Sequence, residues 1–246
     1  MKEGFSQIFM ISSTGGKPIQ VTTEKFNHYS FDWMSGSDGF VFSSNYTEDW
    51  EYDFRNSEIY SISVNGSNLQ QLTDRNGPDM GAAVSPDGKS IAYLGYEDKV
   101  QTYQINNLTI MDIDGGNKRT IDIELDRNIE SLKWSADGKN LYFMYDNYGN
   151  TKIATTNLNG RVRKLIDDVG GTSIGRPYGG GSFSVSLEGE ISYTLTSPYH
   201  PADIGYYEGN SFERLTDLNN DLLRGKDLGV IEEIWYNSYV DGRKIQ

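Results

Sequence analysis

The 246-residue chain contains no cysteine and only two histidines, His28 and His200. The absence of cysteine excludes disulfides, thiolate nucleophiles and cysteine-ligated metal sites. Two histidines cannot build a three-histidine metal site, and each is interpreted as a loop residue bonded to water or backbone. We therefore expect no metal ion and no cofactor in this chain.

Basic residues are also scarce, with 22 Lys and Arg against 35 Asp and Glu and a formal net charge of −13. The densest basic stretch is Arg161, Arg163 and Lys164, whereas a phosphate-binding surface needs clustered positive charge. No long apolar run is present, since Ile8 to Ile11 is too short for a secretion signal or a membrane span. We expect no nucleic-acid partner, no membrane association and a cytoplasmic location.

Glycine is abundant, and it marks a repeat. Turn signals that end in glycine recur at Ser37 to Gly39, Ser85 to Gly88, Ser135 to Gly138 and Ser186 to Gly189, and the glycines are 49, 50 and 51 residues apart. Asp and Gly suit tight turns, because Asp bonds its own backbone and Gly adopts positive φ. A second set of turns lies between these, at residues 15–16, 65–66, 114–116, 159–160 and 208–209.

Each repeat of about fifty residues therefore predicts two hairpins, that is, four antiparallel strands. Such a sheet buries neither face alone and must stack on its neighbours, which is typical of a β-propeller blade. We predict an all-β propeller with about five blade equivalents, four complete and one split. A β-solenoid is the alternative fold, and the only predicted helix is short, within residues 219–227.

The split repeat leaves two interpretations of the ends. Residues 230–246 either pair with the first two strands and close a five-bladed ring, or they belong to a truncated, open array. An open array would expose two blade faces, so self-association through them is expected.

The repeat units Ser85 to Tyr93 and Glu58 to Gly66, the latter followed by Gln71-Leu72-Thr73, resemble the TolB-like (WD40-like) repeats. These repeats are shared by TolB and by S9-type serine peptidases of the prolyl oligopeptidase clan. The tail from Glu233 to Gln246 is similar to the segment with which acylaminoacyl-peptidase-like and dipeptidyl-peptidase-like members enter their α/β-hydrolase domain. The resemblance implies a blade domain over residues 1–231 and an exit segment, or the first strands of a closing blade, over residues 232–246.

No catalytic residue is predicted within the chain. A serine hydrolase nucleophile sits in Gly-x-Ser-x-Gly at a strand-to-helix elbow, and the nearest sequence, Gly180-Gly181-Ser182-Phe183-Ser184, lacks the last glycine. The calcium-loop-like Asp112-x-Asp114-Gly115 lacks the remaining ligands and is interpreted as a turn.

In an up-and-down sheet the tight turns share one end, so the longer connections cluster at the other. The predicted long connections are residues 45–57, 95–107, 146–151 and 197–202 within blades, and 74–79, 122–128, 167–182 and 217–229 between blades. These connections are rich in aromatic residues and arginine, which are enriched at interfaces. The candidate interaction residues are Trp50, Tyr52, Arg55, Tyr103, Arg176, Tyr178, Tyr199 and His200.

Two functions remain open. The first is a non-catalytic propeller that restricts peptide access to a hydrolase domain of the same polypeptide, which the resemblance implies as partner. The alternative is a TolB-like protein-binding module with no enzymatic partner domain.

Overall fold

A computed structural model of the chain describes residues 4–171 and 180–245. The chain divides into two compact units. Met1–Met144 and Ala154–Arg163 form the first, and Tyr145–Ile153 and Lys164–Gln246 form the second. Each unit is considered by itself.

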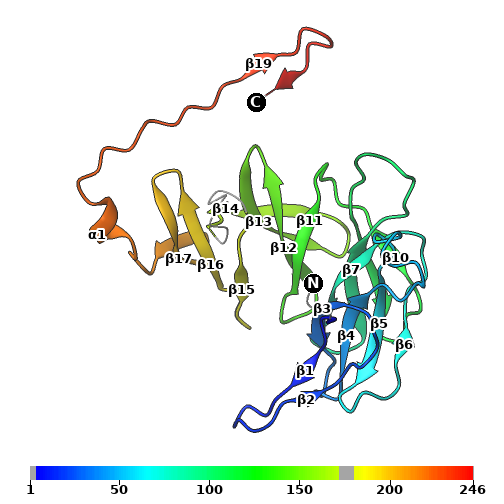
Figure 1. Cartoon of the computed structure of the whole chain (residues 1–246). Helices are drawn as coiled ribbons and strands as arrows, with labels where there is room; N and C mark the ends of the chain where they lie inside the picture. The colour runs from blue at the N-terminus through cyan, green and yellow to red at the C-terminus, as the bar shows by residue number, and fades with distance from the viewer. Residues whose placement is uncertain (1–3, 172–179, 246) are drawn as a thin grey trace. The chain divides into compact units, whose positions relative to one another are not determined.

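The first unit begins with a two-stranded hairpin and continues with four-stranded antiparallel sheets (Figure 1). Its elements are β1 (Phe9–Met10), β2 (Ile19–Gln20), β3 (His28–Trp33), β4 (Gly39–Ser44), β5 (Glu58–Ser63), β6 (Gln70–Gln71), β7 (Asp79–Val84), β8 (Ser90–Gly95), β9 (Asn107–Asp112), β10 (Arg119–Ile121) and β11 (Ile129–Trp134). Blade 1 is β3 to β6 and blade 2 is β7 to β10, each with its strands in chain order.

Three strands are divided between the units: β12 (Asn140–Asn147), β13 (Asn150–Asn157) and β14 (Val162–Val169). They follow β11 in strand order and complete blade 3. The second unit adds β15 (Phe183–Val185), β16 (Ile191–Ser197), β17 (His200–Glu208) and β18 (Ser211–Arg214), which form blade 4. It ends with α1 (Asn220–Leu223) and the hairpin of β19 (Tyr236–Asn237) and β20 (Lys244–Ile245).

The predicted all-β repeat of four antiparallel strands is therefore confirmed. In each blade the first two strands are here called the leading hairpin, and the last two the trailing hairpin. β1–β2 has the turn of a trailing hairpin, since the Gly15 N–H donates to the Ser12 carbonyl as the Gly66 N–H does to that of Ser63.

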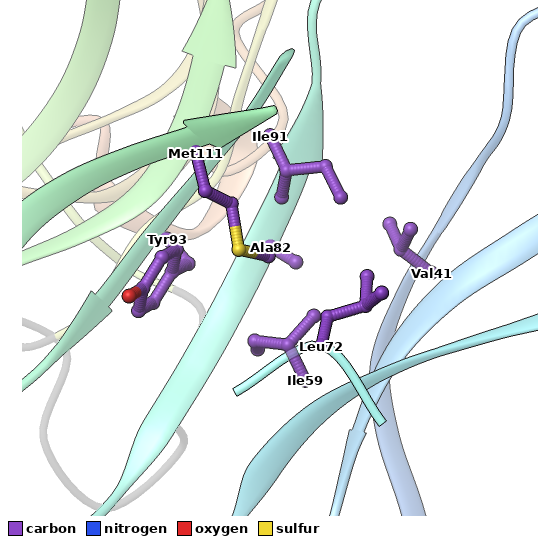
Figure 2. Packing of buried hydrophobic residues seen from close by; sticks show 7 residues of the cluster. All are labelled: Val41, Ile59, Leu72, Ala82, Ile91, Tyr93 and Met111. Carbon is purple, nitrogen blue, oxygen red and sulfur yellow. The ribbon is translucent and has the colours of Figure 1, made fainter. Parts of the chain in front are cut away.

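The core lies between stacked sheets. Figure 2 shows Val41 and Ile59 of blade 1, together with Leu72 directly after β6. They face Ala82, Ile91, Tyr93 and Met111 of blade 2. The other face of blade 1, with Phe40, Phe42, Tyr60 and Ile62, packs on Ile8 and Val21 of the first hairpin. Full burial of one such apolar side chain stabilises the fold by roughly 1.5 to 3 kcal/mol, so stacking holds the blades together.

A polar tie recurs at the start of the trailing hairpins. The Thr73 hydroxyl donates to the Glu58 carboxylate and accepts the Ile59 N–H. The Thr22 hydroxyl makes the same two bonds, to Gln7 and from the Ile8 N–H. In blade 3 an ion pair replaces the hydroxyl bond. The Lys152 ammonium donates to the Asp167 carboxylate, and the two residues are again 15 positions apart. The tie fixes the register of the trailing hairpin in different repeats with different residues.

The predicted first turn was wrong by two positions. The hairpin closes at residues 34–37, where the Ser37 N–H donates to the Met34 carbonyl and the Met34 N–H to that of Gly39. Gly39 is instead the first residue of β4, where a Cβ atom would lie 2.7 Å from the Ile62 carbonyl oxygen. A glycine at position 39 therefore allows β4 to approach β5 closely. The residue of the turn with positive φ is Ser37, at 57°.

Two connections predicted to be long are tight turns. β12 and β13 are joined by Tyr148 and Gly149, with φ of 52° and 74°. β16 and β17 are joined by Pro198 and Tyr199. Positive φ at both Tyr148 and Gly149 matches the twist of a hairpin. In both cases the strands extend into segments that were predicted to be loops.

The predicted helix is reduced to the four residues of α1, none of them buried. The C-terminal strands are also shorter than residues 230–236 and 241–246 suggested, with two residues each. None of the helices in the described part of the chain has the length and hydropathy needed to cross a membrane.

Candidate functional site: the long-loop end

The blades of the first unit have two chemically different ends. At one end the tight turns lie together, since the Val64 N–H donates to the Asp38 carbonyl and the Ile113 N–H to that of Lys89. At the other end lie residues 45–57, 72–78, 96–106 and 122–128, which connect the strands. This second group is called the long-loop end, and its existence was predicted from strand alternation.

Hydrogen bonds join the loops of successive blades at the long-loop end. The Asp98 N–H donates to the Asn76 carbonyl at 2.8 Å and the Tyr96 N–H to the Pro78 carbonyl at 3.3 Å. The Gly77 N–H donates to the Asn56 side chain at 3.0 Å. These bonds link the loops of blades 1 and 2 into one surface.

An open pocket of about 340 Å³ lies at this end of blade 1. It is lined by Tyr46, Thr47, Asn56, Glu58, Tyr60, Gln71, Asp74, Arg75 and Asn76. A smaller pocket of about 160 Å³ shares Asp74 and Arg75 with it. The first volume is at the lower end of the range usual for small-molecule sites.

Glu58 is the buried acid of the larger pocket. Burial raises its pKa to about 7, the Thr73 hydroxyl counteracts this by hydrogen bonding, and Asp79 and Asp74 add to the rise by repulsion. Burial likewise raises the pKa of Tyr60 to about 12. The pocket therefore holds a carboxyl group that exchanges its proton near neutral pH.

Arg75 lies between the two pockets and pairs with Asp79 rather than with Glu58. Asp79 is almost fully buried, and burial raises its pKa although the Arg75 guanidinium acts in the opposite direction. Because the Arg75 guanidinium pairs with Asp79, it lowers the pKa of Glu58 only slightly and does not offset the effect of burial.

The structure places four of the predicted residues on two loops of the first unit. Trp50 is half-buried and packs its ring on Phe5, with centroids 6.1 Å apart. Tyr52 is 85% exposed and Tyr103 is 61% exposed. The Arg55 guanidinium lies over the Phe54 ring at 5.3 Å. Trp50 therefore anchors its loop, while Tyr52 and Tyr103 are available for contact.

The remaining predicted residues belong to the second unit. Tyr199 forms the β16–β17 turn, and its hydroxyl accepts the Ile231 N–H at 3.4 Å. His200 begins β17 and was predicted as a loop residue bonded to water or backbone. Its Nδ1 lies 3.3 Å from the Arg214 guanidinium. Arg176 and Tyr178 lie outside the described residues.

His28, the other histidine, is buried in β3 rather than in a loop. Its Nε2 lies 2.7 Å from the Tyr46 hydroxyl and its Nδ1 lies 2.9 Å from the Ser6 carbonyl. It belongs to the packing of β3 against the N-terminal segment.

His200, Asp203 and Asp217 bring potential metal-ligating atoms close together. Arg214 lies among them, paired with both carboxylates. Burial alone would raise the pKa of Asp203, but bonds from the Leu218 N–H, the Thr216 hydroxyl and Arg214 hold it below its ordinary value. The guanidinium supplies the positive charge that a metal ion would bring, so this cluster ties β17 to β18.

The C-terminal segment contacts the hairpin tips of the second unit. The Trp235 ring meets Tyr148 edge to face, with centroids 5.1 Å apart, and the Lys244 ammonium lies over Trp235 at 5.1 Å. Together with the Ile231–Tyr199 bond, these contacts hold residues 231–244 near the β12–β13 and β16–β17 turns.

Sequence reasoning missed the pocket residues Glu58, Arg75 and Asp79. A signal was present, because Glu58 and Thr73 have the same separation as Gln7 and Thr22. Ser182 lies in the segment that leads into β15, where its N–H donates to the Thr194 hydroxyl.

No family model matches the chain. In sequence it is similar to dipeptidyl-peptidase 5 of Porphyromonas gingivalis, at 24% identity over 154 residues, covering 61% of this chain and 22% of that protein. It is also similar to probable dipeptidyl-peptidase 5 of Arthroderma benhamiae, at 27% identity over 236 residues, covering 87% and 31%. The chain thus spans less than a third of the length of these relatives.

Two solved structures show the same fold. A putative TolB from Agrobacterium tumefaciens superposes with a TM-score of 0.65 at 17% identity, covering 86% of this chain and 74% of that one. A puromycin-hydrolyzing peptidase of Mycobacterium tuberculosis gives 0.61 at 15% identity, covering 85% and 35%. The chain is a TolB-like β-propeller domain related to those of S9-type serine peptidases.

Proposed function

We propose that this propeller restricts access of peptides to an α/β-hydrolase domain that faces its long-loop end. The observation that carries the proposal is the position of residues 231–244, the segment that resembles the family's entry into the hydrolase domain. Trp235 and Ile231 contact Tyr148 and Tyr199, which form hairpin tips at the end of blades 3 and 4 where the longer loops were predicted.

The long-loop end of the first unit also has the surface chemistry of an interface. Tyr52 and Tyr103 are exposed on the loops of blades 1 and 2, and exposed tyrosines are frequent at protein interfaces. The relatives named dipeptidyl-peptidase 5 are several times longer than this chain, which leaves room in them for a catalytic domain.

The test compares two polypeptides, this 246-residue chain and the same chain extended by whatever sequence follows it in the native gene. Hydrogen–deuterium exchange is followed peptide by peptide. We expect slower exchange around Trp50 and Arg176 in the extended polypeptide. Slower exchange confined to the Ser85–Gly88 and Ser135–Gly138 turns would overturn the proposed orientation.

The second candidate is a TolB-like binding module, favoured by the superposition on TolB structures. A stop codon directly after Gln246 in the native gene would support it and remove the first proposal. The purified chain should hydrolyse no peptide under either proposal, so measurable peptidase turnover by this chain alone would contradict both.

A further inference from the structure

A groove of about 430 Å³ lies between blades 2 and 3, at the end opposite the long-loop end. It is here called the blade 2–3 groove. The leading turns of both blades line it, together with Ile110 of β9 and Leu158 of the blade 3 trailing turn. Every residue that lines it belongs to the first unit. The volume is in the range usual for ligand sites.

The equivalent space between blades 1 and 2 is filled by a side chain. Met34 and Ser85 are equivalent, because their N–H groups close the leading turns on the carbonyls of Gly39 and Ser90. Met34 packs against the apolar cluster between blades 1 and 2. Its sulfur would lie 2.9 Å from a Cβ atom at position 39. Because blade 2 has the small Ser85 in place of this methionine, the space next to blade 3 stays open.

The opening is confined to the leading turns. A Cβ atom at Gly88 would overlap Ser35 of the preceding blade, whereas one at Gly138, the equivalent residue of blade 3, would have nothing within 4 Å. The trailing turns approach the preceding blade in both places. A Cβ atom at Gly115 or at Gly160 would meet a carbonyl oxygen directly after the last strand of that blade. Blades 2 and 3 are therefore stacked, and the groove is built by their leading turns.

Three carboxylates line the blade 2–3 groove, those of Asp87, Asp112 and Asp137. In the two leading turns a serine hydroxyl donates to Asp87 or Asp137 and holds the pKa of that carboxyl below its ordinary value. Asp112, the last residue of β9, accepts the Asn117 amide with one oxygen at 2.6 Å. Among the described residues, no donor bonds to its other oxygen. The groove therefore offers carboxylate oxygens to a ligand.

The chain's own cations do not neutralise this groove. Arg119 lines it, but its guanidinium donates to the Leu158 carbonyl at 3.3 Å and, within the described part of the chain, forms no ion pair. Lys139 lies 3.6 Å from the Asp137 carboxylate, and such an exposed pair contributes little. Three carboxylates against one guanidinium leave the groove with a net negative charge.

An aromatic residue accompanies the carboxylates. Trp134 lines the groove, and its indole N–H donates to the Ala83 carbonyl of blade 2 at 3.0 Å, which fixes the ring. A guanidinium is attracted to the face of an indole and donates two parallel bonds to a carboxylate. Arginine suits such a site better than lysine, because its cation is planar and weakly hydrated.

We propose that the blade 2–3 groove binds an arginine side chain of a partner polypeptide, with its guanidinium between Trp134 and Asp112. Ile110 and Leu158 provide apolar contacts for the methylene groups of that side chain. The net charge of −13 attracts basic partners to the chain. The groove lies at the opposite end from the long loops, so this inference is independent of the function proposed above.

The test follows the Trp134 indole N–H resonance of the isotope-labelled chain during addition of acetyl-Gly-Arg-Gly-amide, with Trp134→Phe to assign the signal. We expect a saturable shift. Replacement of arginine by citrulline, its neutral isostere, should weaken binding by about tenfold, and a lysine peptide should also bind more weakly. An unshifted resonance overturns the proposal, and so does equal affinity for the citrulline or the lysine peptide.

A matched pair of variants separates the groove from general attraction to an acidic chain. Asp112→Asn removes a groove carboxylate but keeps an acceptor for Asn117, and should weaken binding by about tenfold. Asp126→Asn makes the same charge change at the long-loop end, where that side chain is 88% exposed, and should leave the affinity unchanged. Equal losses in the two variants would overturn the proposal.

A second pair of variants tests the shape of the groove. The double variant Ser85→Met/Ser90→Gly copies the two residues with which blade 1 fills the equivalent space. We expect it to lose the arginine peptide while keeping the far-UV spectrum and cooperative thermal unfolding of the parent chain. Ser90→Gly alone leaves the groove open and should bind like the parent. Undiminished binding by a folded double variant overturns the proposal.

Discussion

Replacing Glu58 by glutamine should make the blade 1 pocket insensitive to pH between about 4.5 and 7. The folded state raises the pKa of Glu58 from its ordinary 4.5 to about 7, chiefly by burial. The folded chain therefore binds more protons than the unfolded chain in this range, so stability falls as pH rises. Below pH 4.5 the carboxyl group is protonated in both states, and its burial then carries no charge penalty.

The size of the effect follows from the pKa difference. One pKa unit corresponds to about 1.4 kcal/mol, so a rise from 4.5 to about 7 costs about 3 kcal/mol of stability at pH 8. The amide of the Glu58→Gln variant would keep an acceptor for the Thr73 hydroxyl without the charge.

The first hairpin contains the natural equivalent of this variant. The Gln7 carbonyl oxygen accepts the Thr22 hydroxyl, and its amide donates to the Glu24 and Phe26 carbonyls. The positions 17 and 19 residues after Glu58 are Arg75 and Gly77, so we expect their carbonyls to accept from the amide of the variant. The substitution thus copies an arrangement that the chain already uses.

The assay is chemical denaturation of the parent chain and Glu58→Gln from pH 4 to pH 8, followed by tryptophan fluorescence. We expect similar stability at pH 4 and a gain of up to about 3 kcal/mol for the variant at pH 8. A difference between the two proteins that does not change with pH would refute the reasoning, and so would a variant that is less stable at pH 8.

Two further substitutions test the turns and the core. Gly66→Ala should lower stability by more than about 1 kcal/mol, because φ is +80° and the new Cβ would lie 2.6 Å from a backbone carbonyl oxygen; Gly15→Ala, with φ of +87° and nothing within 4 Å, should cost less. Equal losses in thermal denaturation would show that the close approach is unimportant. Ile59→Ala should cost about 2 to 5 kcal/mol, since Ile59 is fully buried in the cluster between blades 1 and 2. Val100→Ala, at a position 92% exposed, should stay within about 0.5 kcal/mol, and a loss as large as that of Ile59→Ala would contradict the packing argument.

The candidate site was only partly accessible to sequence reasoning. Strand alternation placed the loops that carry Trp50, Tyr52 and Tyr103 at one end, because alternation depends on chain order alone. The pocket could not be predicted in the same way. Glu58 and Arg75 meet there through the pairing of β5 with β6 and the path of the following connection, and the burial that changes the pKa of Glu58 has no local signal.

The sequence by itself determined the repeat, the strand positions and the lack of a Gly-x-Ser-x-Gly motif. The repeat and the strands follow from local chemistry, since glycine and aspartate specify turns and alternating apolar residues specify strands. Even there, local chemistry was ambiguous, because Ser37 to Gly39 has the composition of a turn while the hairpin closes at residues 34–37.

Only the tertiary structure decided which apolar faces are covered. Trp33 and Trp134 occupy the same position in their repeats, yet one is 42% exposed and the other donates its indole N–H to Ala83 of the neighbouring blade. The tertiary structure also decided that Tyr148 and Tyr199 form tight turns next to residues 231–244. The physical reason is that burial and contact between blades depend on what stacks on each sheet, and residues far apart in the chain supply that neighbour.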